Sequence, residues 1–314
     1  MNKATGASLS VKGDLLTGVE WSAAQVQDFL RLSADVKNHA ARYRGALDGK
    51  SLVLIFEKPS LRTRVTFEIA VAQLGGYSVF LDHTSSRLGE REPVRDIARN
   101  LERWVQGIIA RVFAQESLED LARNSAVPVI NALSDKYHPC QALADFFTLE
   151  ERFGGLRGLK LAYVGDGNNM CHSLLMAGAQ TGAHVRVAAP EGYWPDPAIV
   201  SHAERIAYGT GGRVEVMQSP QDAVAGVNAV YTDVWASMGQ ESEAAKREAI
   251  FSPYQVNEAL FSLAAPDAVF LHCLPAHRGL EVTDAVMDSP RSVVYDQAEN
   301  RLHVQKAILH TLLG

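Results

Sequence analysis

Two arginines lie where the sequence predicts the start of a helix, although cations are normally unfavourable there. In the stretch FEKPSLRTRVTFE, residues 56–68, Arg62 and Arg64 separate an apolar run from residues with helical spacing. A helix start carries unpaired N–H groups and partial positive charge, so a cation there costs a little free energy. Those N–H groups and guanidinium groups together make a favourable site for an oxyanion. The stretch therefore indicates either an anion site or two ordinary solvated arginines.

Two further clusters contain donors for an oxygen-rich ligand. Arg111 closes an apolar strand. In HPCQ, which begins at His138, Pro139 suits the first helical position, so His138 and Gln141 share one face of the helix start. The alternatives are a surface ion pair for Arg111 and a helix cap for His138.

The stretch GDGNNMCHS is a glycine-rich turn between a strand and a helix. Gly165 and Gly167 match the first two glycines of a dinucleotide-binding fingerprint, but Met170 occupies the third position. No acidic residue ends a second strand about twenty residues later. A dinucleotide-dependent oxidoreductase is therefore disfavoured, and Asn168 and Asn169 become candidate amide ligands for a carboxylate or a zwitterion.

The stretch DVWASMG follows another apolar strand. Asp233 and Ser237 are one helical turn apart, so their side chains can accept hydrogen bonds from one ammonium group. The alternative is that Asp233 caps a helix.

The stretch HCLPAHRG ends a very apolar strand. Cys273 is flanked by His272, His277 and Arg278, which predicts a lowered thiol pKa. The alternative is a small buried apolar residue. Arg301 lies at the start of the expected terminal helix, and it repeats the unusual placement of the first two arginines.

Strand and helix patterns alternate along the chain, which predicts an α/β fold of two domains, each with a central parallel sheet flanked by helices. Strands are expected at 51–56, 77–81, 107–113, 127–131, 159–164, 184–188, 214–217, 229–232, 269–272 and 292–295. Helices are expected at 23–43, 66–74, 94–105, 140–151, 173–182, 198–208 and 302–313, with a short one after residue 113.

The boundary between the domains is placed near Gly154. The first domain is expected to span 1–152 and the second 153–297. The C-terminal helix, within 298–314, is expected to pack back on the first domain. Since open parallel sheets bind ligands at the carboxyl ends of their strands, we expect the clusters to lie at those edges.

Composition excludes several kinds of partner. The 30 basic and 36 acidic residues give a net charge of −6, which argues against nucleic acid and against an anionic membrane surface. There is no run long and apolar enough to span a membrane and no signal-peptide core, so a cytoplasmic protein is expected. The three cysteines form no C-x-x-C pair, which fits a reducing compartment and disfavours a cysteine-rich zinc site.

Taken together, the clusters resemble the aspartate/ornithine transcarbamoylase family, and within it the ornithine carbamoyltransferases. The resemblance runs from about Leu52 to the C-terminus and comprises five separate motifs in the order found in the family. It implies transfer of the carbamoyl group from carbamoyl phosphate to the side-chain amine of L-ornithine, giving L-citrulline and phosphate, in arginine biosynthesis or the reverse catabolic direction.

The resemblance also implies a set of site residues and an assembly. The first domain would bind carbamoyl phosphate and the second ornithine, in a homotrimer with active sites at subunit interfaces, without a metal or another cofactor. The implied carbamoyl phosphate ligands are Ser60, Leu61, Arg62, Thr63, Arg87, Arg111, His138, Gln141, Cys273, Leu274 and Arg301. The implied ornithine ligands are Asn169, Asp233, Ser237 and Met238. The implied catalytic residues are Arg62, Arg111, His138 and Cys273.

These residues suit the implied reaction. Arg62 would hold the phosphate, while Arg111, His138 and Thr63 would donate toward the carbamoyl oxygen, where negative charge grows during attack. Holding two reactants in contact supplies on the order of 7–11 kcal/mol of the barrier. The attacking amine must lose a proton, and the candidate acceptors are Cys273, Asp233 and the departing phosphate. A covalent cysteine intermediate is not expected.

Two positions depart from the family pattern. Leu61 stands where many members carry threonine, which matters little if this position contributes its backbone N–H. Arg87 stands where ornithine enzymes often carry a glutamine that reaches the carbamoyl phosphate of a neighbouring subunit. An arginine there either donates to the phosphate or points into solvent. The polar segment 239–248 is expected to form a lid over ornithine.

The sequence leaves two rival functions. One is a transcarbamoylase for another amine acceptor, such as putrescine or acetylornithine. The other is a noncatalytic binding relative, which the complete set of implied ligands disfavours.

Overall fold

The computed structural model describes residues 13–85, 87–236 and 243–314. The chain forms two compact units. One contains the chain up to Ser134 together with Leu302–Gly314, and the other is Asp135–Arg301. The C-terminal segment therefore joins the first unit, as the sequence predicted. Residues 135–152, which the sequence placed in the first domain, group here with the second unit.

The first unit has a four-stranded parallel sheet with the strand order β2-β1-β3-β4. Its strands are β1 (Ser51–Phe56), β2 (Tyr77–Asp82), β3 (Gly107–Arg111) and β4 (Val129–Leu133). Its helices are α1 (Ala23–Asn38), η1 (Ala40–Tyr43), α2 (Leu61–Gln73), α3 (Val94–Leu101) and α4 (Gln115–Arg123), together with the C-terminal part of α12 (Val294–Leu313).

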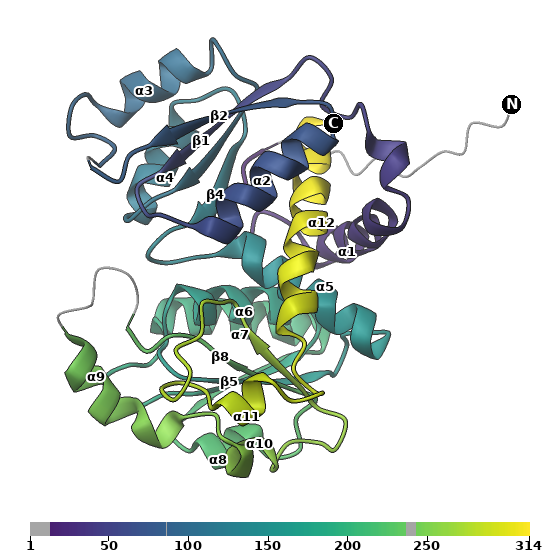
Figure 1. Ribbon diagram of the computed structural model, residues 1–314, viewed down its shortest axis with the longest axis vertical. Helices are drawn as coiled ribbons and strands as arrows, with labels where there is room; N and C mark the ends of the chain where they lie inside the picture. Colours follow the sequence, from purple (N-terminus) through teal and green to yellow (C-terminus); the bar gives the residue numbers. More distant parts are fainter. Residues whose placement is uncertain (1–12, 86, 237–242) are drawn as a thin grey trace, which may run out of the picture. The chain divides into compact units, whose positions relative to one another are not determined.

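Helices cover both faces of this sheet, which explains why its central strands are almost entirely apolar. Alternate residues such as Val53 and Ile108 pack with Ala98 of α3 and Leu118 of α4. On the other face, Figure 1 shows α2 and α12 across the sheet from α3 and α4. Burial on both faces leaves the strand ends as the exposed functional edge of the sheet.

The second unit has a five-stranded parallel sheet with the strand order β7-β6-β5-β8-β9. Its strands are β5 (Lys160–Val164), β6 (His184–Ala188), β7 (Arg213–Met217), β8 (Ala229–Thr232) and β9 (Val269–His272). Its helices are α5 (Pro139–Phe153), α6 (Asn169–Thr181), α7 (Pro197–Thr210), α8 (Pro220–Val224), α9 (Ala244–Phe251), η3 (Ser252–Tyr254), α10 (Glu258–Phe261) and α11 (Asp284–Met287), with the start of α12.

The core of the second unit also lies on both faces of its sheet. Val164 and Phe270 pack with Leu260 of α10 and Val286 of α11. Figure 1 shows α6 and α7 on the opposite face from α8, α10 and α11. Chain order reverses between β5 and β8, so the loops after these two strands flank a topological switch point, the usual ligand site of such sheets.

Most expected elements are present, with three instructive differences. The strand expected at 292–295 is wrong, because Ser292 forms only an isolated bridge with Phe270 before α12 begins at Val294. The helix expected at 23–43 ends at Asn38 and continues as the separate turn η1. The helix expected at 66–74 begins at Leu61, which places the first arginine cluster inside its first turn. Within the described part of the chain, none of the helices has the length and apolar content needed to cross a bilayer.

Candidate active site

The first group of predicted site residues lies at the carboxyl ends of β1 and β3, the switch point of the first sheet. Arg111 is the register partner of Phe56, and its carbonyl accepts a hydrogen bond of 2.9 Å from the N–H of Glu57. The loop after β1 and the end of β3 are therefore held side by side. The register between β3 and β4 shifts between Ala110 and Arg111, so the regular pairing of the two strands is interrupted at this end.

Glu57, which the sequence analysis missed, organises this edge. Its carboxylate accepts hydrogen bonds of 2.6 Å from the N–H groups of Leu88 and Phe113. The side chain is buried, so these bonds fix the start of two further loops against the end of β1. An acidic residue directly after a buried apolar strand was the available signal in the sequence.

The start of α2 separates the two arginines of the first cluster. Ser60 is the N-cap, and its side chain accepts from the N–H of Thr63 at 3.3 Å. Arg62 is partly buried in the first turn. Arg64 instead pairs with Glu68 at 3.1 Å and is exposed, so it behaves as an ordinary surface arginine. Of these two arginines, Arg62 is the one that remains a candidate for the anion site.

Two further cations lie beside this edge. The guanidinium of Arg87 is 4.4 Å from the ring centroid of Phe113, and the ammonium of Lys58 is also 4.4 Å from that centroid. Arg87 is therefore in contact with a ring beside the loop after β3, although its side chain is exposed. Lys58 is buried and was not singled out from the sequence.

In the second unit, Gln141 lies in the first turn of α5 and is held by Asp145 one turn later. Nε2 of Gln141 donates to Asp145 at 2.7 Å, and Nε2 of Gln297 donates to the same carboxylate oxygen at 2.7 Å. Burial raises the pKa of Asp145 to about 7, against the opposing effect of these hydrogen bonds. Oε1 of Gln141 is buried and has no hydrogen-bond partner among the described residues.

His138 and Arg301 lie in the same region of this unit. The backbone N–H of His138, the residue before α5, donates to Oγ of Ser173 at 2.7 Å. Arg301 is buried on α12. Burial raises the pKa values of Asp145 and Cys273, and the charge of Arg301 partly opposes that rise, so the carboxyl and thiol groups lie within electrostatic range of its guanidinium. Arg301 is thus near Cys273, the residue that follows β9.

Asp233, the first residue after β8, is held at the switch point of the second sheet. Its Oδ1 accepts from the thiol of Cys273 at 3.0 Å, and its Oδ2 accepts from Nδ2 of Asn168 at 3.1 Å. Asn168 is also the N-cap of α6, since its Oδ1 accepts from the N–H groups of Met170 and Cys171. Both polar ends of Asn168 are therefore used in orienting Asp233 and capping the helix, while Asn169 begins α6.

The predicted lowering of the Cys273 pKa is wrong. Burial, followed by the charge of Asp233 and the hydrogen bond to it, raises the pKa of the Cys273 thiol well above its usual value. The expected cations do not offset this effect. Arg278 pairs with the carboxylates of Asp284 and Asp288. The cysteine is therefore a neutral thiol near pH 7.

Both ring nitrogens of His272 are used in contacts within the protein. Its Nε2 lies 3.2 Å from Glu281, and its Nδ1 accepts from the N–H of Leu274 at 2.8 Å. That contact supports Leu274 in the left-handed region, with φ of 58°, which is an unfavourable conformation for a residue with a bulky side chain. Asp233, His272 and Cys273 bring potential metal-ligand atoms within 4.8 Å of one another, but both histidine nitrogens already have protein partners.

Ser237 and Met238 lie outside the described residues, as does the first part of the expected lid. At the described end, Arg247 of α9 is buried and pairs with Asp166 at 2.8 Å. It also donates to the carbonyl of Trp235 at 2.9 Å and pairs with Glu243 at 3.2 Å. Arg247 thus connects Trp235 and Glu243, on either side of residues 237–242, to Asp166 in the loop after β5.

Comparison with known proteins gives the same family over almost the whole chain. Residues 14–151 match the model "Aspartate/ornithine carbamoyltransferase, carbamoyl-P binding domain", and residues 157–312 match "Aspartate/ornithine carbamoyltransferase, Asp/Orn binding domain". The ornithine carbamoyltransferase of Thermococcus kodakarensis is 51% identical over 303 residues, which are 96% of each chain. That of Thermus thermophilus is 53% identical over 309 residues, 98% of this chain and 99% of the relative.

A solved structure supports the same assignment. Ornithine carbamoyltransferase from Pyrococcus furiosus has a TM-score of 0.94 and 50% sequence identity, and the match covers 98% of this chain and 99% of that one. Both the sequence models and the fold therefore agree with the motifs. The chain belongs to the aspartate/ornithine carbamoyltransferase family.

Proposed function

We propose that this chain transfers the carbamoyl group of carbamoyl phosphate to the side-chain amine of L-ornithine, giving L-citrulline and phosphate. The names of relatives about half identical over nearly the full length support this reaction. The observation that carries it is the placement of Asp233, which Asn168 and Cys273 hold at the switch point of the second sheet. An oriented carboxylate there suits the ammonium group of an amino acid.

The phosphate is proposed to bind at the start of α2. Arg62 and the backbone N–H groups of the first turn supply donors, and the helix start itself favours an anion. Lys58 adds a buried positive charge in the loop that leads to this turn. The proposed carbamoyl phosphate ligands of the first unit are Ser60, Leu61, Arg62, Thr63, Arg87 and Arg111, and those of the second unit are His138, Gln141, Cys273, Leu274 and Arg301.

The carbamoyl group is proposed to be recognised at both its oxygen and its nitrogen. Arg111, His138 and Thr63 donate toward the oxygen, where they stabilise the charge that forms in the transition state. Gln141 offers Oε1 to the carbamoyl N–H, because its own Nε2 is already committed to Asp145. This arrangement recognises an amide-like group and distinguishes it from a second phosphate or carboxylate.

Ornithine is proposed to bind through Asn169, Asp233, Ser237 and Met238. Asp233 accepts from the α-ammonium, which leaves the terminal amine free to attack. Because the Cys273 thiol is protonated near neutral pH, it cannot take up the proton that the amine loses. Asp233 and the departing phosphate remain as acceptors, and the catalytic contribution of Cys273 is positioning and hydrogen bonding.

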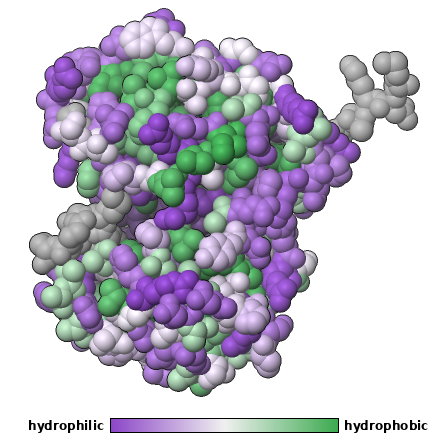
Figure 2. Space-filling view, viewed as in Figure 1, coloured by the Kyte–Doolittle hydropathy of each residue, from purple (hydrophilic) through white to green (hydrophobic). Residues whose placement is uncertain are grey.

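A homotrimer is proposed because α2 carries an uncovered apolar stripe. Leu61, Val65 and Ile69 lie at successive helical turns and are 75%, 41% and 39% exposed. The edge strand β2 adds Tyr77 and Val79. Figure 2 shows a band of apolar surface in the region of α2. A stripe of this kind is suited to burial against another copy, and Arg87 of that copy is proposed to donate to the phosphate.

A cytoplasmic site of action is also proposed. Three free cysteines, Cys140, Cys171 and Cys273, fit a reducing compartment. The direction of the reaction is proposed to be synthetic, since a relative from Pyrococcus furiosus that is 50% identical is named as the anabolic enzyme.

A substrate panel tests the proposed reaction. Purified protein is incubated with carbamoyl phosphate and, separately, ornithine, putrescine, acetylornithine or aspartate, and the ureido product and phosphate are measured. We expect equal amounts of both products with ornithine and neither above background with the others. Products with putrescine or acetylornithine but not with ornithine would establish a different acceptor. The absence of product with every amine would establish a noncatalytic relative.

A further inference from the structure

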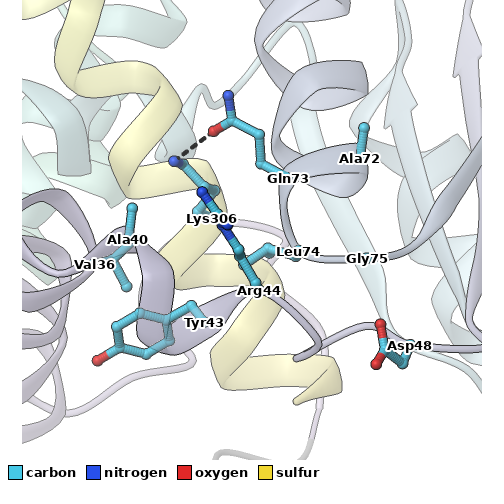
Figure 3. A pocket seen from close by; sticks show the side chains of 10 residues that line it. All are labelled: Val36, Ala40, Tyr43, Arg44, Asp48, Ala72, Gln73, Leu74, Gly75 and Lys306. Carbon is cyan, nitrogen blue, oxygen red and sulfur yellow. Dashed lines mark hydrogen bonds between the residues drawn. The ribbon is translucent and has the colours of Figure 1, made fainter.

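The first unit contains a pocket that the proposed reaction does not use. It has a volume of about 580 Å³ and lies among η1, the end of α2 and α12. Figure 3 shows the side chains that line it, including Tyr43, Arg44, Gln73 and Lys306. A volume of this size is in the usual range for small-molecule sites, and the lining combines apolar walls with a few polar groups.

Lys306 is the buried cation of this pocket. Its residue is 4% exposed, and its ammonium donates to Oε1 of Gln73 at 2.7 Å. An ammonium has three N–H donors, and no other bond from it to a described residue is present. Burial lowers the pKa of Lys306, as expected for an ammonium group whose hydrogen-bond partner is a neutral amide.

Arg44 supplies a second positive charge to the same lining. It follows η1 and is exposed, and within the described part of the chain neither Arg44 nor Lys306 has a carboxylate at ion-pair distance. Among the described residues that line the pocket, Asp48 is the only acidic one, and Figure 3 shows it apart from the two cations. The pocket therefore has one end rich in donors and positive charge and another end that carries a negative charge.

We propose that this pocket binds a small metabolite through a single oxyanion group, carboxylate or phosphate, which Lys306 and Arg44 hold together. The ammonium of Lys306 donates charge-assisted hydrogen bonds from the buried part of the pocket. The guanidinium of Arg44 donates a planar pair of hydrogen bonds from the solvent-exposed part. Asp48 opposes a second anionic group on the ligand. The bound oxyanion compensates the buried charge of Lys306, for which Gln73 provides only a neutral partner.

Calorimetric titration of the whole protein with inorganic phosphate, and separately with acetate, tests the proposal. With phosphate we expect the titration to show an additional class of binding sites besides the active site. Lys306→Met and Arg44→Gln should each weaken the additional class by about tenfold or more, the effect of losing a charge-assisted hydrogen bond. Acetate binding that depends on the same residues would identify a carboxylate ligand, and phosphate binding alone would identify a phosphorylated one.

Arg42→Gln is the matched control. Arg42 is an exposed arginine two residues before Arg44, but it pairs with Asp35 and does not line the pocket. This variant should retain both classes of phosphate binding. The proposal is overturned if neither anion gives an additional class, or if Lys306→Met leaves that class unchanged. Because Lys306 and Arg44 have no role in the proposed reaction, turnover of ornithine by these variants should be retained.

A crystal soaked in selenate gives an independent readout, because selenium has an anomalous signal. We expect an anomalous peak within hydrogen-bond distance of Nζ of Lys306, and no such peak in a crystal of the Lys306→Met variant. Selenate found at the start of α2 alone, or the same peak in the variant, would contradict the proposal. The first of those outcomes would leave the proposed reaction intact.

Discussion

Asp145 fixes the orientation of the Gln141 side-chain amide. The carboxylate accepts from Nε2 of Gln141 at 2.7 Å across one turn of α5, and an ionised carboxylate has no proton to donate. The amide nitrogen must therefore face Asp145, and Oε1 must face away from it. A buried residue outside the predicted ligand set thus decides which atom Gln141 offers to a substrate.

This relationship predicts a pH dependence of carbamoyl phosphate binding. The pKa of Asp145 is raised to about 7, so the carboxyl gains a proton as the pH falls through neutrality. A protonated carboxyl can donate, and the amide then loses its single orientation. We expect the KM for carbamoyl phosphate to rise below pH 7 in the native protein. Asp145→Asn, which cannot titrate, should have a raised KM that changes little between pH 6 and 8. Identical pH profiles for the two proteins would contradict this role.

The same residue predicts how stability changes with pH. Its pKa is raised on folding from about 3.8 to about 7, so the folded protein binds this proton more tightly than the unfolded chain does. The contribution to the free energy of unfolding is complete below about pH 4 and is lost as the pH rises through 7. The unfolding temperature should therefore fall more between pH 5 and 8 in the native protein than in Asp145→Asn. A larger fall in the variant would show that the shift has the opposite sign.

The protonated state of Cys273 predicts slow alkylation. Iodoacetamide reacts with thiolates, so Cys273 should react more slowly at pH 8 than free cysteine does. Asp233→Asn removes a negative charge that raises the thiol pKa, and it should accelerate the reaction. Peptide mapping by mass spectrometry measures the rate at each cysteine. Asp284→Asn, an exposed acid of the same unit that pairs with Arg278, is the control and should leave the rate unchanged.

Arg62 is predicted to be the essential arginine of the first cluster. Arg62→Ala should lower kcat/KM for carbamoyl phosphate by about 10²–10³-fold, because it removes charge-assisted donors from the phosphate. The unfolding temperature should change little, since the side chain is only partly buried. Arg123→Ala is the control, because this exposed arginine of the same unit pairs with Asp120. Near-native activity of Arg62→Ala would show that the phosphate does not bind at the start of α2.

The apolar stripe of α2 predicts the assembly. If the proposed trimer forms through this stripe, Val65→Glu and Ile69→Glu should each convert it into monomers, because a carboxylate on the stripe would have to be buried at the interface. Sedimentation velocity measures the mass of the assembly. Tyr208→Glu, at a 92% exposed position of the second unit, should leave the trimer intact. If both stripe variants remain trimeric, a different surface forms the interface.

Local pattern determined the fold class and the position of most motifs. Buried parallel strands read as short apolar runs, and the residues that follow them must lie at the carboxyl edge of a sheet. This is why the sequence alone assigns Arg111, Asp233 and Cys273 to functional edges. The expected strand at 292–295 failed because an apolar run this short is ambiguous, and here it pairs with Phe270 through a single bridge before a helix begins.

The tertiary structure decided how individual side chains are used. Arg62 and Arg64 belong to one motif, but only packing shows that Arg64 lies on Phe80 while Arg62 is partly buried. Asp145 receives a hydrogen bond from Gln297, 152 residues later in the chain, and such partners leave no local signal. Adjacent cations in the sequence favour a lowered Cys273 pKa, yet burial and Asp233 raise it. Spacing along the chain specifies elements and their edges, whereas burial and charge depend on segments that meet only after folding.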